Sequence, residues 1–219
     1  MIYELPLFPL NTVLFPNMPI ALHIFEPRYK LMIEQCLHNE QPFGVVLIRE
    51  GDEALGPLSD PHPIGCTAHI TQVERLPDGR LNIVAVGDER FQIHALSHDK
   101  PYLTGSVETF PLTGDNTPSL NRHGQSLRPL VERYLDMLAQ VSDEVEFEPE
   151  HLPDDPVMLG YLAAALLQVP TEQKQTLLAQ DGANSFMSTV RQMYRREVPL
   201  MSALIERESR MQQGLFSLN

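Results

Sequence analysis

Few residues of this chain have the types and spacing that catalysis requires. Its three lysines, Lys30, Lys100 and Lys174, follow Tyr, Asp and Gln, whereas a phosphate-binding P-loop needs Gly-Lys before Ser or Thr. The segment Gly124-Gln125-Ser126-Leu127-Arg128 begins like a nucleophile elbow but lacks the second glycine that allows the sharp turn. A Ser-Lys dyad would have to use one of the three lysines outside any nucleophile motif. We therefore predict no catalytic residues, no cofactor and no enzymatic activity.

Two Cys/His pairs have spacings at which a thiolate and an imidazole can share a metal ion. Cys36 lies two residues before His38, and Cys66 lies three residues before His69. The alternative is that both thiols are buried as small apolar side chains, because Cys36 falls on the apolar face of a predicted helix and Cys66 begins a predicted strand. This second interpretation is favoured, and no metal site is predicted.

Charge and composition narrow the class of partner. The chain has 219 residues, with 16 Lys and Arg against 29 Asp and Glu, which gives a net charge of −13. Such a chain offers no basic surface for phosphate groups, so nucleic acid and anionic membranes are not expected partners. No apolar run approaches the roughly 18 residues that span a bilayer. Because the N-terminus lacks a signal-peptide pattern and only two cysteines occur, a cytoplasmic location is expected.

The elements that would position functional residues change character near residue 112. Up to that point, short β-type runs alternate with Pro and Gly, and residues 27–37 form the one predicted helix, with Pro27 at its first position. Strands are predicted at residues 20–25, 43–48, 66–76, 80–86, 91–96 and 103–110. The Pro77-Asp78-Gly79 turn predicts a hairpin between two of them. These strands are enough to close a small barrel or pseudobarrel.

From about residue 119 the apolar residues recur at helical spacing. Leu127, Val131 and Tyr134 belong to one such stripe, and further helices are predicted at about residues 155–167 and 171–182 and from about residue 184 onward. Four helices with short connections predict a small bundle. The fold class is therefore α+β, with a β-rich domain at residues 1–112 and a four-helix bundle at residues 119–215.

Two features of the helical half could contact a partner. Met187, Met193 and Met201 recur along the last helix, and thioether side chains adapt to irregular apolar surfaces. Core packing is the alternative explanation for this stripe. The acidic run at residues 143–150 could bind cations or a basic partner, but a solvated loop is the favoured interpretation, because the acids show neither EF-hand spacing nor helical periodicity.

Several segments together resemble the N-terminal substrate-binding domain of Lon proteases, in order and in approximate spacing. They are Leu5-Pro6-Leu7-Phe8-Pro9-Leu10, Val13-Leu14-Phe15-Pro16, His23-Ile24-Phe25-Glu26-Pro27-Arg28-Tyr29, Pro63-Ile64-Gly65-Cys66-Thr67-Ala68, Leu76-Pro77-Asp78-Gly79-Arg80 and Gly87-Asp88-Glu89-Arg90-Phe91. The helical half also looks like the part that follows in that family, so the resemblance covers roughly residues 3–208.

The resemblance implies a PUA-like β pseudobarrel followed by a helical bundle, the region with which the protease engages unfolded or tagged polypeptides. It does not imply proteolysis, because the ATPase and Ser-Lys protease modules fit neither within 219 residues nor with the three lysines. The chain thus resembles stand-alone Lon-domain proteins. We expect a non-catalytic module that binds unfolded polypeptide or a protein partner, in an adaptor or chaperone-like role.

The expected binding surfaces are the groove between the two halves and the barrel rim. The rim candidates are Phe15, Phe25, Glu26, Arg28, Tyr29 and Arg90. Arg28 and Arg90 lie beside Glu26 and Glu89, so structural ion pairs are the alternative role for these charges. A small-molecule binder or unrecognised hydrolase with a pocket in the pseudobarrel, and an RNA-binding PUA-like protein, are kept as alternative functions.

Overall fold

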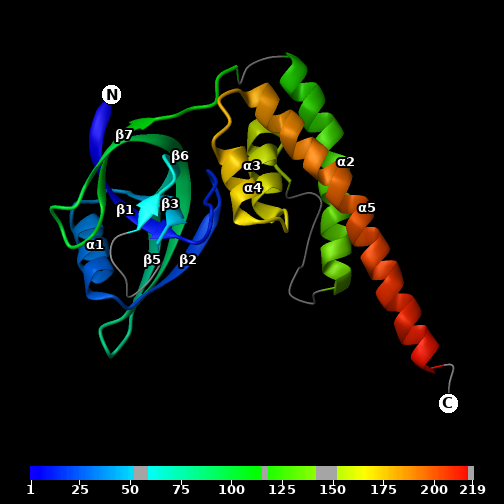
Figure 1. The fold of residues 1–219 in the computed structure, drawn as a ribbon, viewed down its shortest axis with the longest axis horizontal. Helices are drawn as coiled ribbons and strands as arrows, with labels where there is room; N and C mark the ends of the chain where they lie inside the picture. The colour runs from blue at the N-terminus through cyan, green and yellow to red at the C-terminus, as the bar shows by residue number, and fades with distance from the viewer. Residues whose placement is uncertain (52–58, 115–117, 142–151, 217–219) are drawn as a thin grey trace. The chain divides into compact units, whose positions relative to one another are not determined.

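The structure is a computed structural model that describes residues 1–51, 59–114, 118–141 and 152–216. It is a mixed α/β fold with a mainly antiparallel sheet and five helices in these ranges (Figure 1). The strands are β1 (Ile2–Leu10), β2 (Pro19–Ile24), β3 (Phe43–Glu50), β4 (Asp60–Pro61), β5 (Ile64–Arg75), β6 (Leu81–Ser97) and β7 (Thr104–Thr109). The helices are α1 (Pro27–His38), α2 (Pro118–Val141), α3 (Pro156–Leu166), α4 (Thr171–Leu178) and α5 (Ala183–Phe216).

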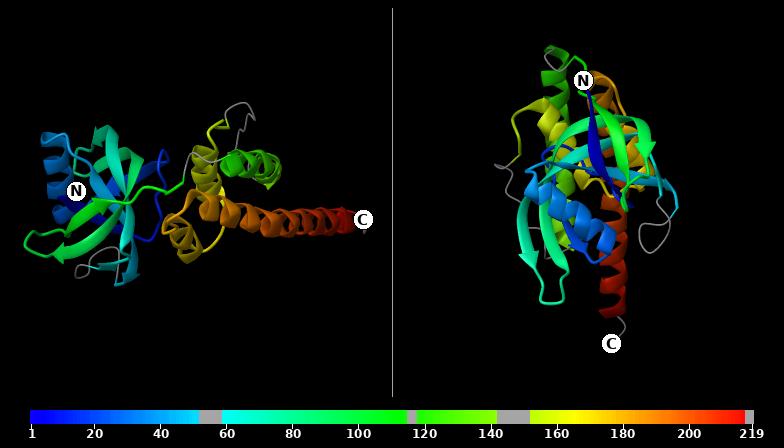
Figure 2. Two further views of the ribbon diagram at one scale, coloured as in Figure 1. Left: turned by 90° about the horizontal axis from the view of Figure 1, so that it is seen from above. Right: turned by 90° about the vertical axis from the view of Figure 1, so that its left-hand side faces the viewer.

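The sheet closes on itself. Its strand order is β1-β7-β6-β5-β3-β4, and β1 also pairs in parallel with β3, so that five strands form a ring. Strand β2 stands off this path and pairs with the first part of β6 (Figure 2). Ring closure gives each of the five strands at least two neighbours, whereas β2 has one described neighbour.

The predicted first helix is confirmed, and its apolar face fills the barrel core. Pro27 occupies its first turn, where the missing amide hydrogen costs no helical bond. Tyr29, Met32, Ile33 and Cys36 are its buried side chains, so Cys36 lies on the apolar face as predicted. They pack with residues of β1, β3, β5 and β6 in one continuous apolar cluster.

The predicted hairpin is also confirmed. The amide of Leu76 donates to the carbonyl of Arg80 over 2.9 Å, and Gly79 has a φ of 76°, which a residue without a side chain adopts at little cost. The prediction of two separate strands within residues 80–96 was wrong, because β6 is one strand of 17 residues. Its register with β5 shifts where Thr67 faces an additional residue, and the Thr67 hydroxyl satisfies both the amide and the carbonyl of Glu89.

The chain divides into two compact units. Unit 1 comprises residues 1–113 and 164–181, and unit 2 comprises residues 114–163 and 182–219. Helix α4 groups with the β-rich unit. A single four-helix bundle is therefore not confirmed. The physical reason is that α4 makes its buried polar contacts with β5 and β6, as described below.

Unit 2 is built on the pairing of its two long helices. α2 and α5 lie side by side, and the rings of Tyr134 and Tyr194 meet edge to face at 5.2 Å (Figure 1). The Tyr194 hydroxyl donates to the carbonyl of Ala163. Asp155 caps the start of α3, because its carboxylate accepts a bond from the amide of Met158.

Candidate functional site

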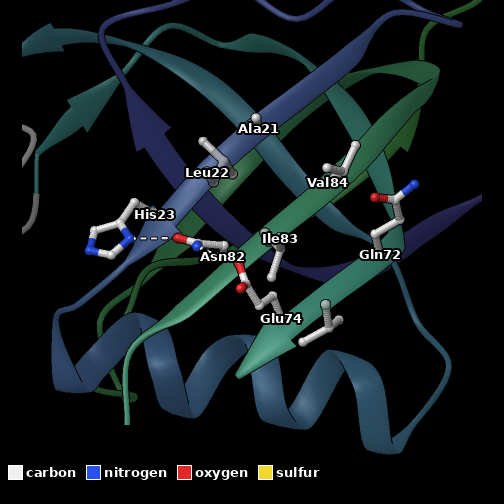
Figure 3. A pocket seen from close by; sticks show the side chains of 9 residues that line it. Ala21, Leu22, His23, Gln72, Glu74, Asn82, Ile83 and Val84 are labelled. Atoms are coloured by element: carbon white, nitrogen blue, oxygen red, sulfur yellow. Dashed lines mark hydrogen bonds between the residues drawn. The ribbon is translucent and has the colours of Figure 1, made fainter. Parts of the chain in front are cut away.

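A hollow of about 410 Å³ lies on the outer face of the three-stranded part of the sheet formed by β2, β6 and β5 (Figure 3). Two cross-strand rows supply six of its nine lining residues, and each row joins three residues that are paired in register. The rows are Ala21-Val84-Gln72 and His23-Asn82-Glu74. The first row offers the apolar side chains of Ala21 and Val84 next to the amide of Gln72, and the second row is polar.

The polar row is a chain of hydrogen bonds. His23 Nδ1 lies 2.7 Å from Asn82 Oδ1, and Asn82 Nδ2 donates to Glu74 Oε2 over 2.7 Å. Arg80 Nη1 lies 3.3 Å from His23 Nε2. Asn82 Oδ1 is an acceptor and an arginine is only a donor, so the two ring nitrogens of His23 face groups of opposite hydrogen-bonding type. These polar groups satisfy one another and fix one edge of the hollow.

Phe25 extends the apolar part of this surface. It follows β2 directly, its ring stacks on that of His23 at 6.1 Å, and it is 45% exposed. Val73 of β5 is another large apolar side chain left exposed beside the hollow. Glu74 supplies the one formal charge among the lining residues at neutral pH. This surface can therefore take an apolar ligand group together with a basic one.

The neighbouring candidates Glu26, Arg28 and Tyr29 serve the structure of the rim. Arg28 Nε lies 2.9 Å from Glu26 Oε2, and both side chains are largely buried. The Arg28 guanidinium also covers the Tyr29 ring at 4.8 Å, and the ring of Phe8 stacks on that of Tyr29. The ion pair and the stacked ring fix the start of α1, so Phe25 is the exposed one among the six predicted rim residues.

Arg90 binds the end of α4 through its guanidinium. Its side chain is 3% exposed, and Nη1 donates to the carbonyls of Leu178 and Gln180, each over 2.6 Å. Its guanidinium also lies 4.8 Å from the centre of the Phe110 ring. Gln175 of α4 adds a bond to the carbonyl of Ile64. Arg90 is thus a buried anchor for the end of α4.

The remaining candidate residues are mainly core residues. Phe15 and Met187 are fully buried, and Met187 packs closely beside Gly160. Met193 and Met201 are half-buried on α5. The acidic run at residues 143–150 lies outside the described residues. The structure therefore brings Phe25 to the same surface as the hollow but does not gather all the predicted candidates in one place.

The two cysteines are separate buried thiols. Cys36 and Cys66 both belong to the core cluster of unit 1, and His69 is bonded to Asp88. Across the described ranges, no group of three or more Cys, His, Asp or Glu side chains is placed to hold a metal ion. Burial raises the pKa of Cys36 to about 11 and that of Cys66 to about 12. Such thiols are protonated and unreactive near neutral pH.

This burial predicts slow thiol chemistry and a loss of stability in alkali. The raised pKa lowers the thiolate fraction about a hundredfold relative to an unfolded chain, so labelling by Ellman's reagent near pH 8 should be at least that much slower in the folded protein. The folded state keeps its thiol protons above the ordinary pKa of 9.0, so the free energy of unfolding should fall as the pH rises beyond that value. Rapid labelling of either thiol without denaturant would contradict the buried positions.

Sequence reasoning found Phe25 but missed the two rows that make the hollow. His23 stood within a quoted motif, but Asn82, Glu74 and Val84 carried no signal except the alternation of their strands. The predicted hairpin implies that β5 faces β6. Only the folded structure shows that β2 pairs with the other side of β6, which completes the surface.

Comparison with known proteins identifies the family. Residues 4–185 match the model of the ATP-dependent protease La (LON) substrate-binding domain. The chain belongs to this family. Lon protease 1 of Hydrogenovibrio crunogenus is 25% identical over 197 residues, which are 88% of this chain and 24% of that protein. Lon protease of Escherichia coli strain K12 is 24% identical over 204 residues, which are 90% of this chain and 25% of that protein.

Solved structures of Lon N-terminal domains share the fold. The Lon N-terminal domain protein from Xanthomonas campestris has a TM-score of 0.66 and 27% identity, covering 86% of this chain and 96% of that one. The N-terminal domain of Mycobacterium avium complex Lon protease also has a TM-score of 0.66, at 18% identity, and covers 88% of this chain and 98% of that one. The chain spans about a quarter of the length of the Lon proteases that it matches. None of its described helices is long and apolar enough to cross a bilayer.

Proposed function

We propose that this chain is a non-catalytic module that binds unfolded polypeptide through the outer face of β2, β6 and β5. The observation that carries the proposal is the hollow on this face, with Phe25 exposed beside it. Membership of the Lon substrate-binding domain family supports a role in substrate recognition. An adaptor or chaperone-like action, and the PUA-like character of the closed sheet, are parts of the same proposal.

The chemistry of the surface favours particular segments of a polypeptide. Unfolded chains expose apolar side chains that folded proteins bury, and Ala21, Val84 and Phe25 offer apolar area to receive them. The carboxylate of Glu74 lies at the border of that area, and unit 1 carries 16 acidic side chains against eight basic ones. We therefore expect preference for apolar segments that also contain Lys or Arg.

A cytoplasmic location is part of the same proposal. Two buried thiols that form no disulfide are consistent with the reducing conditions of the cytoplasm.

Replacement of Phe25 by alanine tests the proposal. Loss of a partly exposed aromatic contact should weaken binding of a permanently unfolded protein, reduced and carboxymethylated α-lactalbumin, by about tenfold. Val84→Glu should weaken it further, because a carboxylate would be placed on the apolar row. Fluorescence anisotropy of the labelled polypeptide gives the dissociation constants.

Ile2→Glu is the matched control. Ile2 is 56% exposed and borders a different hollow, on β1, β6 and β7, so its replacement should leave binding unchanged. Absence of binding by the unsubstituted protein would refute the proposed function. Equal losses from Ile2→Glu and Val84→Glu would refute the assignment of the binding face.

A small-molecule ligand is a second candidate for the same hollow. The convergence of His23, Asn82 and Glu74 favours it, and the volume of about 410 Å³ falls in the range of about 300–1,000 Å³ usual for such sites. It ranks second because these polar groups already bond to one another. A ligand that copurifies with the protein in native mass spectrometry, and is absent from the Asn82→Ala variant, would favour this candidate.

A further inference from the structure

Strand β2 has one edge to which no other strand is added. Within the described part of the chain it pairs with β6 and with no further strand. Figure 3 shows β2 at the margin of the three-stranded face, with β6 and β5 following on one side. An edge strand of this kind presents backbone donors and acceptors in a regular row.

The register identifies the residues that offer these backbone groups. The amide of Gly87 donates to the carbonyl of Met18 over 2.9 Å, at the position just before the first pair, Pro19 with Val86. In an antiparallel ladder, hydrogen-bonded pairs recur every second residue. The even-numbered residues of β2 therefore bond to β6, and the backbone N–H and C=O groups of Ala21 and His23 point to the open edge.

We propose that the polypeptide bound by this chain adds to the open edge of β2 as an extended strand, bonded to the backbone of Ala21 and His23. This inference rests on the proposed function and specifies how its ligand is held. Backbone pairing would explain how unrelated sequences are accepted, because every extended segment carries the same N–H and C=O groups. Side chains of the added strand would then lie beside the exposed Ala21, His23 and Phe25.

Charge distinguishes a foreign segment from a second copy of this chain. Two copies joined edge to edge would bring together two units that each carry a surplus of acidic side chains. A segment containing Lys or Arg would instead be attracted by this surplus of acidic side chains. The occupant that fits best is therefore an extended segment of another polypeptide, with apolar and basic residues in alternation.

Ala21→Pro tests this mode of binding. Proline removes the outward N–H and places its ring at the edge, yet it breaks no bond to β6 at this position. The probe is a synthetic peptide of alternating valine and lysine with the six-residue length of β2. Ala21→Pro should weaken its binding about tenfold or more. Ala21→Val, which keeps the N–H, should bind the peptide several times more tightly than Ala21→Pro does. Ile2→Glu, at a different hollow, should bind within about twofold of the unsubstituted protein.

Hydrogen exchange of the unsubstituted protein provides a measurement that does not depend on the folding of a variant. On addition of the peptide, exchange of the Ala21 and His23 amides should slow by about tenfold or more, while that of the Leu22 amide, already bonded to β6, should change little. Unchanged exchange at Ala21 and His23 in a saturated complex would overturn the proposal. If the peptide is bound, but Val84→Glu prevents binding and Ala21→Pro does not, the ligand lies on the sheet face: the proposed function stands and edge pairing is refuted.

Two further outcomes distinguish the absence of any polypeptide ligand from occupation of the edge by a second copy of this chain. Failure of both the peptide and carboxymethylated α-lactalbumin to bind would refute the proposed function itself. A dimer in sedimentation analysis that Ala21→Pro dissociates, with no peptide binding, would show that a second copy occupies the edge and would contradict the proposal.

Discussion

Replacement of Arg90 by methionine is expected to lower the free energy of unfolding of unit 1 by about 3 kcal/mol and to detach the end of α4 from the sheet. Methionine keeps an unbranched apolar stem but is shorter than arginine and has no donor. The carbonyls of Leu178 and Gln180 would lose charge-assisted bonds inside the protein, and the contact with the Phe110 ring would be lost as well. The amides of α4 should then exchange faster than those of α1.

Arg75→Met is the matched control for this prediction. Arg75 also lies on the sheet and also bonds a partner, Glu34, but both side chains are exposed to solvent. Exposed ion pairs contribute about 0–1 kcal/mol, so urea unfolding should barely distinguish this variant from the original protein. Equal destabilisation by the two substitutions would show that Arg90 does not act as a buried anchor.

Gly87→Ala is expected to lower the free energy of unfolding by about 3 kcal/mol and to loosen β2. A methyl group at this position would lie 2.4 Å from the carbonyl oxygen of Phe15, which is part of the backbone and has little freedom to move. Gly87 also exchanges bonds with Asn17 and Met18, the residues that lead into β2. Displacement of this segment should therefore reduce both stability and polypeptide binding.

Gly105→Ala provides the comparison in the same sheet. Its added methyl group would approach the end of the Leu7 side chain at 2.9 Å, and a flexible side chain can turn away. We expect a loss of about 1 kcal/mol or less. Thermal unfolding followed by circular dichroism measures both variants, and a Gly87→Ala protein as stable as Gly105→Ala would contradict the close approach.

The family motifs carry more information about the fold of this chain than about its binding surface. In the segment Gly87-Asp88-Glu89-Arg90-Phe91, Gly87 admits the Phe15 carbonyl and Arg90 holds α4. The Phe91 ring fills the space that the absent side chains of Gly44 and Gly65 leave open. Such residues maintain the scaffold, whereas the surface that we propose for binding contains residues such as Val84 and Asn82, which lie outside the quoted motifs.

The sequence alone determined the local elements of this protein. Its prolines and glycines set the hairpin at residues 77–79 and the start of α1, and its apolar periodicity identified the buried face of that helix. These features depend on interactions between residues near one another in the chain, so their signals are local. The sequence also shows directly that nucleotide-binding and nucleophile motifs are absent from it.

The tertiary structure decided which distant segments meet. The pairing of β1 with β3 closes the ring, that of β2 with β6 creates the outer face and its open edge, and Arg90 draws α4 into unit 1. Each contact joins residues separated by tens of positions, and the same apolar pattern is compatible with several pairings. Long-range register is fixed by the packing of the whole core, which is why the site could not be assembled from spacing alone.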